Sequence, residues 1–112
     1  MASTPRPGRP VRGSTTGRPL NALFDLLGRR QALRVLWELQ KARLTFRALQ
    51  EACGGVSPTV LNQRLRELRE TGLVDLQEGE GYGLTPLGQQ LWQVLLPMRD
   101  WAVERWTKAI PS

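Results

Sequence analysis

Histidine is absent from the 112-residue sequence, and cysteine occurs once, at Cys53. Ordinary zinc sites and Cys–His catalysis need imidazole or several thiolate groups, so the sequence excludes both. It also lacks the glycine-rich and lysine-containing motifs that bind nucleotide phosphates, and its glycine-rich run at 79–83 is better explained by a hairpin turn. We therefore expect a protein that is not an enzyme and that holds no metal ion or cofactor.

Long apolar runs are also missing, and acidic residues are missing from the first 20 positions. No run approaches the roughly 20 apolar residues needed to cross a bilayer, and the N-terminus does not have the apolar centre of a secretory signal. We expect a cytoplasmic protein with no membrane partner. Residues 1–19 offer too little apolar surface to fold, so we predict a disordered basic tail there and one domain over residues 20–112. The tail carries most of the net positive charge of +6, through Arg6, Arg9, Arg12 and Arg18, with no acidic residue to offset them.

The most informative stretch is residues 57–71, which has the signals of a helix with a defined start and end. The Ser57 hydroxyl can accept the amide hydrogens of a first helical turn, and Pro58 suits the first helical position, where no donor is needed. Gly72 can adopt the left-handed conformation that ends helices. Spacings of four and three residues predict one buried stripe, formed by Leu61, Leu65 and Leu68.

The opposite side of this predicted helix is polar. Its side chains can pair with base edges or phosphates: Asn and Gln with adenine, Arg with guanine, and Thr with the thymine methyl group. The alternative is an amphipathic helix whose polar face only contacts water. The candidate DNA-binding residues on and beside this helix are Ser57, Thr59, Asn62, Gln63, Arg64, Arg66 and Arg69.

The remaining patterns predict the elements of a winged helix-turn-helix. A second helix over 30–39 should place Leu33, Leu36 and Trp37 inward, and a third should start at the cap Thr45. Further predictions are helices over 20–27, 46–52 and 86–108, a bridge at Leu44, a kink at Pro97, and strands over 73–77 and 82–84. The fold class is therefore mainly α (α+β), with a two-stranded wing and a long C-terminal dimerisation helix.

Apolar residues cover two sides of the helix expected over 86–108. One stripe should pack against the core of the domain: Leu87, Leu91, Val94, Met98 and Trp101. A single small domain has little interior for a second stripe, so we expect the other flank to contact a partner subunit. The predicted homodimer interface combines that flank with the first helix: Leu20, Leu23, Phe24, Leu27, Trp92, Leu96, Val103 and Trp106.

Five segments together resemble the HxlR-type transcriptional regulators, small relatives of the MarR-like winged-helix proteins. They are GRRQALRVLWEL at 28–39, LTFRAL at 44–49, VSPTVLNQRLREL at 56–68, GLV at 72–74 and YGLTPLG at 82–88. The resemblance implies a homodimer that binds operator DNA through residues 57–71 and the wing, and regulates transcription. The chain departs from the family's pattern at Thr59, where a lysine is frequent, in the short acidic wing over 77–81, and in having no cysteine near the start of the domain.

Other residues have two open interpretations each. Arg29, Arg30 and Arg47 either contact DNA phosphates or are solvated surface charges. Cys53 is either a redox sensor or a small buried apolar group. Trp37, with Trp92, Trp101 or Trp106, either lines a pocket for an aromatic effector or belongs to the core.

The sequence favours a sequence-specific DNA-binding transcriptional regulator that acts as a homodimer on an inverted repeat, with residues 57–71 in the major groove of double-stranded DNA. One alternative is a winged-helix protein-interaction module, which the acidic wing favours. The other is a non-specific nucleic-acid binder driven by the basic tail, which the shortage of aromatics that could stack on bases disfavours.

Overall fold

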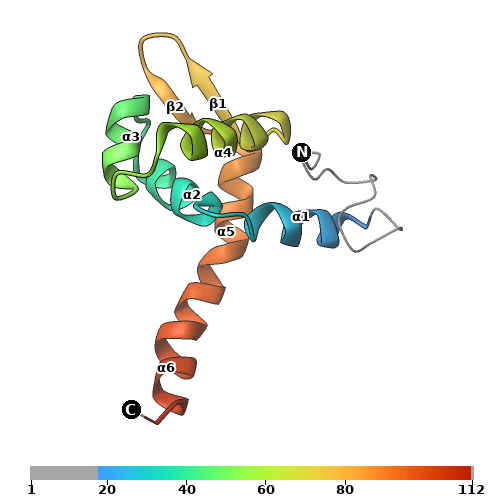
Figure 1. The fold of residues 1–112 in the computed structure, drawn as a ribbon. Coiled ribbons are helices and arrows are strands. Elements are labelled where there is room, and N and C mark those ends of the chain that lie inside the picture. The colour runs from blue at the N-terminus through green and yellow to red at the C-terminus, as the bar shows by residue number, and fades with distance from the viewer. Residues whose placement is uncertain (1–17, 112) are drawn as a thin grey trace.

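The computed structural model describes residues 18–111, which form a winged helix with two projecting helical arms (Figure 1). The basic tail that we predicted over 1–19 lies outside the described residues except for Arg18 and Pro19, and Pro19 already belongs to the first helix. The elements in chain order are α1 (Pro19–Leu27), α2 (Ala32–Lys41), α3 (Phe46–Ala52), α4 (Pro58–Glu70), β1 (Val74–Gln77), β2 (Gly81–Leu84), α5 (Pro86–Trp101), a π-helical segment (Ala102–Trp106) and α6 (Thr107–Ala109).

Three helices begin at the hydroxyl caps that the sequence predicts. The Oγ atoms of Thr45, Ser57 and Thr85 accept hydrogen bonds from the backbone N–H groups three residues later, at 3.2, 3.2 and 3.0 Å. Proline follows the cap in α4 and α5, where the missing N–H has no helical partner in any case. The starts of α3, α4 and α5 are therefore set by local sequence.

The predicted start of α2 is wrong, and its predicted inner face is only partly right, because Leu36 is buried and Leu33 is not. The helix begins at Ala32 rather than Arg30, because Gln31 adopts a left-handed conformation with φ of 71° that a right-handed helix cannot include. Leu33 faces solvent and is 42% exposed. The buried stripe has the ordinary helical spacing but is shifted by one residue, and consists of Ala32, Val35, Leu36 and Leu39.

The wing is an antiparallel hairpin in which Val74 pairs with Leu84 and Gln77 pairs with Gly81. A third segment extends it, as predicted: Leu44 forms an isolated bridge to Tyr82, with N–O distances of 2.9 and 2.8 Å. The bridge joins the segment between α2 and α3 to the wing. It therefore fixes the wing relative to the helices.

The core lies behind α4, between that helix, α2, α3 and the base of the wing. Its members from α4 are Leu61, Leu65 and Leu68, all of them fully buried. Burying a leucine side chain contributes roughly 1.5–3 kcal/mol, so rotating α4 to hide its polar face would lose several kcal/mol. The packing of these leucines thus determines which side of α4 faces outward.

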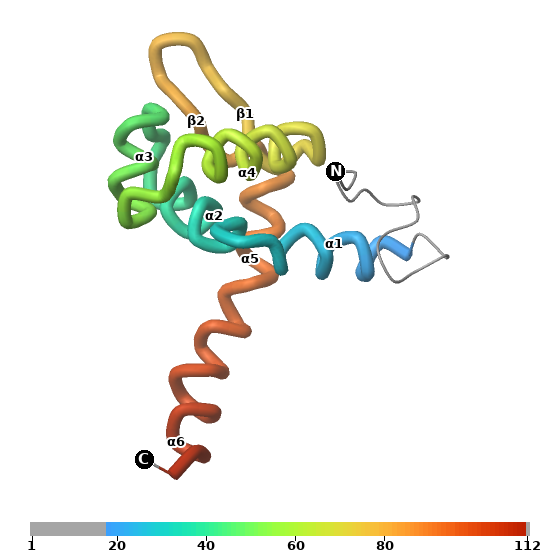
Figure 2. The backbone as a smooth tube through the Cα atoms, viewed as in Figure 1, coloured from blue at the N-terminus to red at the C-terminus, as the bar shows by residue number. Residues whose placement is uncertain are grey.

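The C-terminal helix leaves the domain instead of lying on it (Figure 2). Our prediction that one stripe of it packs on the core is wrong for Leu87, Val94, Met98 and Trp101, which are exposed, Val94 by 71%. Leu91, with Trp92, does pack against the core. The radius of gyration of 15.1 Å exceeds the value of about 13 Å expected for a compact domain of 100 residues. The last turns therefore have no core to cover their apolar side chains.

The C-terminal helix is not regular throughout. It continues through Pro97 to Trp101 and then widens into a π-helical segment that the sequence did not predict. The Thr107 N–H and hydroxyl both donate to the carbonyl oxygen of Ala102, the hydroxyl at 2.9 Å. Because a π turn aligns residues five positions apart, Trp101 and Trp106 stack with ring centroids 6.0 Å apart.

Candidate nucleic-acid interface

The outward face of α4 gathers the polar side chains that the sequence singled out. Thr59, Asn62, Arg66 and Arg69 are exposed, and Gln63 is half-buried. Together with Tyr82 of β2 these residues line an open groove beside the wing. The outward face of α4 therefore presents hydrogen-bond donors and acceptors, while the opposite side of the helix packs in the core.

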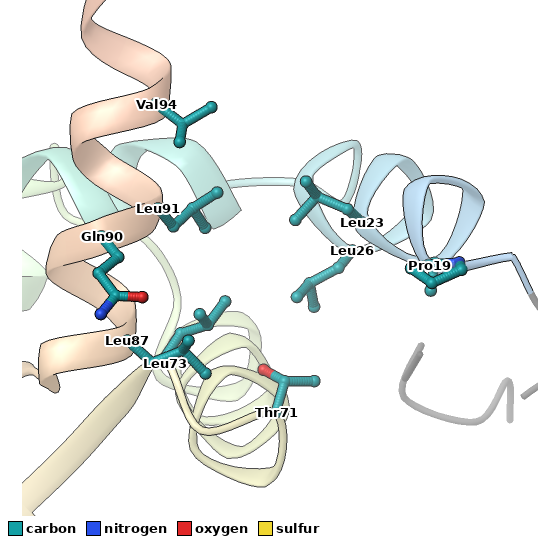
Figure 3. A pocket seen from close by; sticks show the side chains of 10 residues that line it. Pro19, Leu23, Leu26, Thr71, Leu73, Leu87, Gln90, Leu91 and Val94 are labelled. Carbon is teal, nitrogen blue, oxygen red and sulfur yellow. The ribbon is translucent and has the colours of Figure 1, made fainter. Parts of the chain in front are cut away.

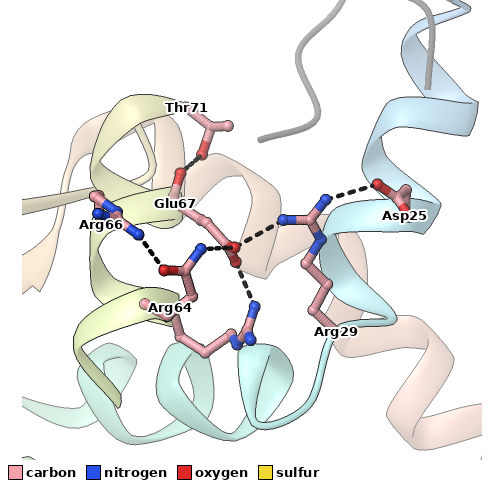
Figure 4. A network of polar contacts seen from close by, with 7 residues as sticks. Asp25, Arg29, Arg64, Arg66, Glu67 and Thr71 are labelled. Carbon is pink, nitrogen blue, oxygen red and sulfur yellow. Dashed lines mark hydrogen bonds and ion pairs between the residues drawn. The ribbon is translucent and has the colours of Figure 1, made fainter. Parts of the chain in front are cut away.

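A buried carboxylate lies under one edge of this face. Glu67 is 1% exposed, and its oxygens accept hydrogen bonds from Arg29 at 2.7 Å, Arg64 at 2.6 Å and Gln63 at 2.7 Å (Figure 4). Arg29 also pairs with Asp25 of α1 at 3.1 Å. Two guanidinium groups thus balance two carboxylates, which is the condition under which a charge is tolerated in a protein interior.

Two of the predicted DNA-binding arginines belong to this buried cluster. The side chains of Arg29 and Arg64 are each 15% exposed, and both direct a guanidinium nitrogen at Glu67. The Arg64 contact lies within α4, whereas the contacts of Arg29 join α4 to α1 and the turn that follows it. Sequence reasoning missed Glu67 itself, although its spacing of three and four residues from Arg64 and Gln63 is the spacing of neighbours on a helix.

The other predicted contact residues surround α4. Arg47 is exposed on α3, and Ser57 is exposed at the N-terminus of α4. Arg30 is also exposed, but it lies in the turn before α2 rather than in its first turn, because α2 begins at Ala32. These positions leave Arg30, Arg47, Arg66 and Arg69 as the solvent-facing arginines among the predicted contact residues.

Cys53 ends α3 and is 7% exposed. Burial, together with the nearby carboxylate of Glu38, raises the pKa of the Cys53 thiol, and Arg34 acts in the opposite direction. Arg34 also links α2 to the end of α3, because it pairs with Glu38 at 2.9 Å and donates to the carbonyl oxygen of Ala52 at 2.9 Å. A thiol with a raised pKa is protonated at neutral pH and is a weak nucleophile.

The wing carries a charge pattern of its own. At its base Arg43 pairs with Asp75 and donates to the carbonyl oxygen of Gly81 at 3.0 Å, contacts that the sequence analysis did not identify. At its tip, Glu78 and Glu80 are exposed. A duplex that approaches α4 would therefore meet negative charge at the end of the wing.

The residues predicted for a dimer interface fall into two groups. Leu20, Phe24, Val103 and Trp106 are exposed apolar side chains on the two arms, and Leu23 and Leu96 are partly buried. By contrast, Leu27 and Trp92 pack against the core, where the Trp92 ring meets Trp37 edge to face at 5.5 Å. The core-facing position of Trp92 results from its location early in α5, where the helix still lies against the domain.

An apolar pocket of about 280 Å³ lies between α1 and α5 (Figure 3). It is lined mainly by aliphatic side chains, with Thr71 and Gln90 at its edge. None of its lining residues is a tryptophan, so the predicted tryptophan-lined effector pocket does not coincide with it. Trp37 and Trp92 pack on each other, and Trp92 also lines a second pocket, beside Arg43 and Gln89.

Within the described chain, no helix combines the length and hydrophobicity needed to cross a membrane. Across residues 18–111 there is likewise no cluster of three or more metal-ligating side chains.

Comparison with known proteins agrees with the order of elements described above. A family model described as HxlR-like helix-turn-helix matches residues 26–110, which include the core, α4 and the wing. This chain belongs to the HxlR-like helix-turn-helix family. Membership assigns it to the non-enzymatic transcriptional regulators that bind DNA through a helix-turn-helix fold. No curated protein matches the chain by sequence.

Solved structures of other regulators share this fold. Quinone-bound YodB from B. subtilis is 29% identical, with a TM-score of 0.70, over 76% of this chain and 96% of that one. A possible HxlR family transcriptional factor from Thermoplasma volcanium GSS1 is 26% identical, with a TM-score of 0.65, over 72% and 78%. A MarR family regulator from Enterococcus faecalis V583, also 26% identical, has a TM-score of 0.72 over 80% and 87%.

Proposed function

We propose that this HxlR-like regulator acts as a homodimer on an inverted-repeat operator, with α4 of each subunit in the major groove. The observation that carries the proposal is the outward polar face of α4, held in place by three fully buried leucines on its other side. A helix with a rigid backing and exposed Asn, Thr and Arg side chains is suited to reading base edges.

The exposed residues fall into two groups according to the part of the DNA that each is placed to contact. Thr59, Asn62 and Arg66 lie on the outermost part of α4 and are proposed to meet base edges. Arg69, Arg47 and Arg30 lie farther along or beside the helix and are proposed to contact phosphates, which fix register but carry no sequence information. Arg29 and Arg64 are assigned a supporting role because Glu67 holds their guanidinium groups.

The two helical arms support the homodimer. α1 and the C-terminal helix leave the domain in different directions (Figure 1), and both carry exposed apolar side chains. The set comprises Leu20, Phe24, Leu87, Val94, Met98, Trp101, Val103, Trp106 and Ile110. Large exposed apolar surfaces on a soluble protein commonly mark interaction sites. A second copy would cover it and provide the second recognition helix that an inverted repeat requires.

The test is selection of bound sequences from random duplex DNA with the full-length protein at physiological salt. A palindromic motif with half-sites about one helical turn apart would support both the specificity and the symmetry. Recovery of DNA without enrichment of a sequence would favour the non-specific binder driven by the basic tail. Absence of binding would favour the protein-interaction module, for which the acidic wing tip is the supporting observation.

We also propose that the regulator acts in the cytoplasm. Cys53 is buried and its thiol has a raised pKa, so we assign it a packing role rather than redox sensing. We propose no effector for the apolar pocket between α1 and α5.

A further inference from the structure

We propose that Gln63 does not read adenine, as its residue type would suggest, but positions Arg66 to read guanine. This inference rests on the proposed function and adds to it the identity of one base and the residue that specifies it. The observation behind it is a chain of two hydrogen bonds that links the surface to the buried cluster: Arg66 donates to Gln63, and Gln63 donates to Glu67 (Figure 4).

The two neighbours of Gln63 determine which way its amide points. A carboxylate can only accept hydrogen bonds and a guanidinium can only donate them. The Gln63 side-chain nitrogen must therefore face Glu67, at 2.7 Å, and its oxygen must face the Nη2 atom of Arg66. The reversed amide would place two acceptors together on one side and two donors together on the other.

The Glu67 carboxylate cannot easily release the amide. It is 1% exposed and is held from two further sides by Arg29 and Arg64, which come from different parts of the chain. A bidentate contact with adenine needs the glutamine nitrogen and oxygen side by side at the base edge. The bond to Glu67 directs the Gln63 nitrogen toward the protein, and the Gln63 oxygen that an adenine contact would need already accepts a hydrogen bond from Arg66.

Arg66 keeps the capacity for a bidentate contact. A guanidinium carries five N–H donors in a rigid plane, so the bond to Gln63 leaves donors for the two acceptors of guanine, O6 and N7. The Arg66 side chain is exposed, and the bond to Gln63 restricts its rotation before DNA arrives. Gln63 thus reduces the ordering that Arg66 would otherwise undergo on binding.

The test compares wild-type protein with Arg66→Ala, Gln63→Met and the double variant on every single-base variant of the selected operator. Methionine retains the length and volume of glutamine but forms no comparable hydrogen bonds. Arg66→Ala should remove a guanine preference of roughly 5- to 150-fold at one base pair. Gln63→Met should weaken the same preference at the same base pair, and should have no further effect there when Arg66 is already alanine.

Asn62→Ala is the matched control, because Asn62 is exposed on the same face and lies outside the chain of hydrogen bonds described above. Its effect should fall at a different base pair and should add independently to that of Arg66→Ala. Binding to a scrambled duplex, expected to be unchanged in Gln63→Met, verifies that the variant is folded.

The inference is overturned if Gln63→Met changes the preference at an A·T pair that Arg66→Ala leaves alone, or if it changes no preference at all. These results would leave the DNA-binding proposal intact, because the wild-type protein would still select an operator. If the wild-type protein enriches no sequence, the proposed function fails and this inference fails with it.

Discussion

At the residue scale, the ion pairs of Glu67 determine which arginine side chains near α4 remain exposed and able to contact a ligand. It draws the guanidinium groups of Arg29 and Arg64 inward and leaves Arg66 at the surface. Buried ion clusters of this kind are not strongly stabilising in themselves, but they are costly to break, because removal of one member leaves the others charged and unpaired.

Replacement of Glu67 by alanine should therefore lower the free energy of unfolding by about 3–5 kcal/mol, because Arg64 loses its carboxylate partner and Arg29 pairs with one carboxylate, Asp25, in place of two. Urea denaturation followed by circular dichroism measures the change. Glu104→Ala is the control: Glu104 is exposed on the C-terminal arm, and its loss should change stability by less than about 0.5 kcal/mol. A loss below about 1 kcal/mol for Glu67→Ala would show that Arg29 and Arg64 are readily hydrated instead.

Local and long-range contacts explain which residue predictions succeeded. The caps Ser57 and Thr85 were predictable because each bonds to an amide three residues away. The role of Arg29 was not, because its partner Glu67 is 38 positions along the chain. The sequence alone does not show which arginine will form an ion pair with a carboxylate that is distant along the chain. The contact of the remaining surface residues with DNA stays a prediction.

At the scale of elements, the wing depends on two glycines with positive φ that differ in their surroundings. Gly79 and Gly81 have φ of 79° and 88°, values that side-chain-bearing residues adopt only with strain. A Cβ atom at Gly79 would meet no atom within 4 Å, whereas one at Gly81 would collide with the carbonyl group of Leu44. Gly81 is thus needed both for its backbone conformation and for the bridge that attaches the wing.

We expect Gly79→Ala to destabilise the protein by roughly 1–2 kcal/mol, the cost of the left-handed conformation. Gly81→Ala should cost a further ~1–3 kcal/mol, because the Leu44 bridge must also move. Thermal unfolding of the two variants gives the comparison, and faster hydrogen exchange at the Leu44 and Tyr82 amides should accompany only Gly81→Ala. Equal effects in the two variants would mean that the close approach to Leu44 relaxes without cost.

The order and type of the elements were predictable, and several boundaries were not. The hairpin, the Leu44 bridge and the caps follow from turn residues and alternation over a few positions. The later start of α2 follows from the conformation of Gln31, a residue type that does not usually adopt positive φ. The π turn depends on the two bonds from Thr107 to Ala102, and no periodicity in the sequence signals it.

At the scale of the whole molecule, the two arms create more apolar surface than one subunit can bury. The sequence predicted that the C-terminal helix is apolar on two sides, but it could not indicate that the helix leaves the domain. The direction of α5 is set by packing near its start, where Leu91 and Trp92 meet the core. Beyond that point Val94, Met98 and Val103 face solvent in the single chain.

The proposed homodimer should dissociate when charge is placed on this surface. In Phe24→Asp combined with Val103→Asp, two carboxylates would have to be buried without partners, which costs several kcal/mol per subunit. Analytical ultracentrifugation should find a dimer for the wild type and a monomer for the variant. Leu33→Asp places the same charge on an exposed leucine of α2, which belongs to neither arm; it is the matched control and should remain dimeric. A wild-type monomer at micromolar concentration would contradict the homodimer.

The distribution of the aromatic rings gives the molecule a built-in optical reporter. All four tryptophans lie on α2 or the C-terminal helix, and α4 and the wing contain none. Trp101 and Trp106 are stacked on each other and more than half exposed, so pairing of the arms would shield their indoles and shift their emission to shorter wavelength. A duplex docked on α4 would leave that emission almost unaltered. Intrinsic fluorescence can therefore follow subunit association without a label, while an added fluorophore on the nucleic acid follows recognition in the same cuvette.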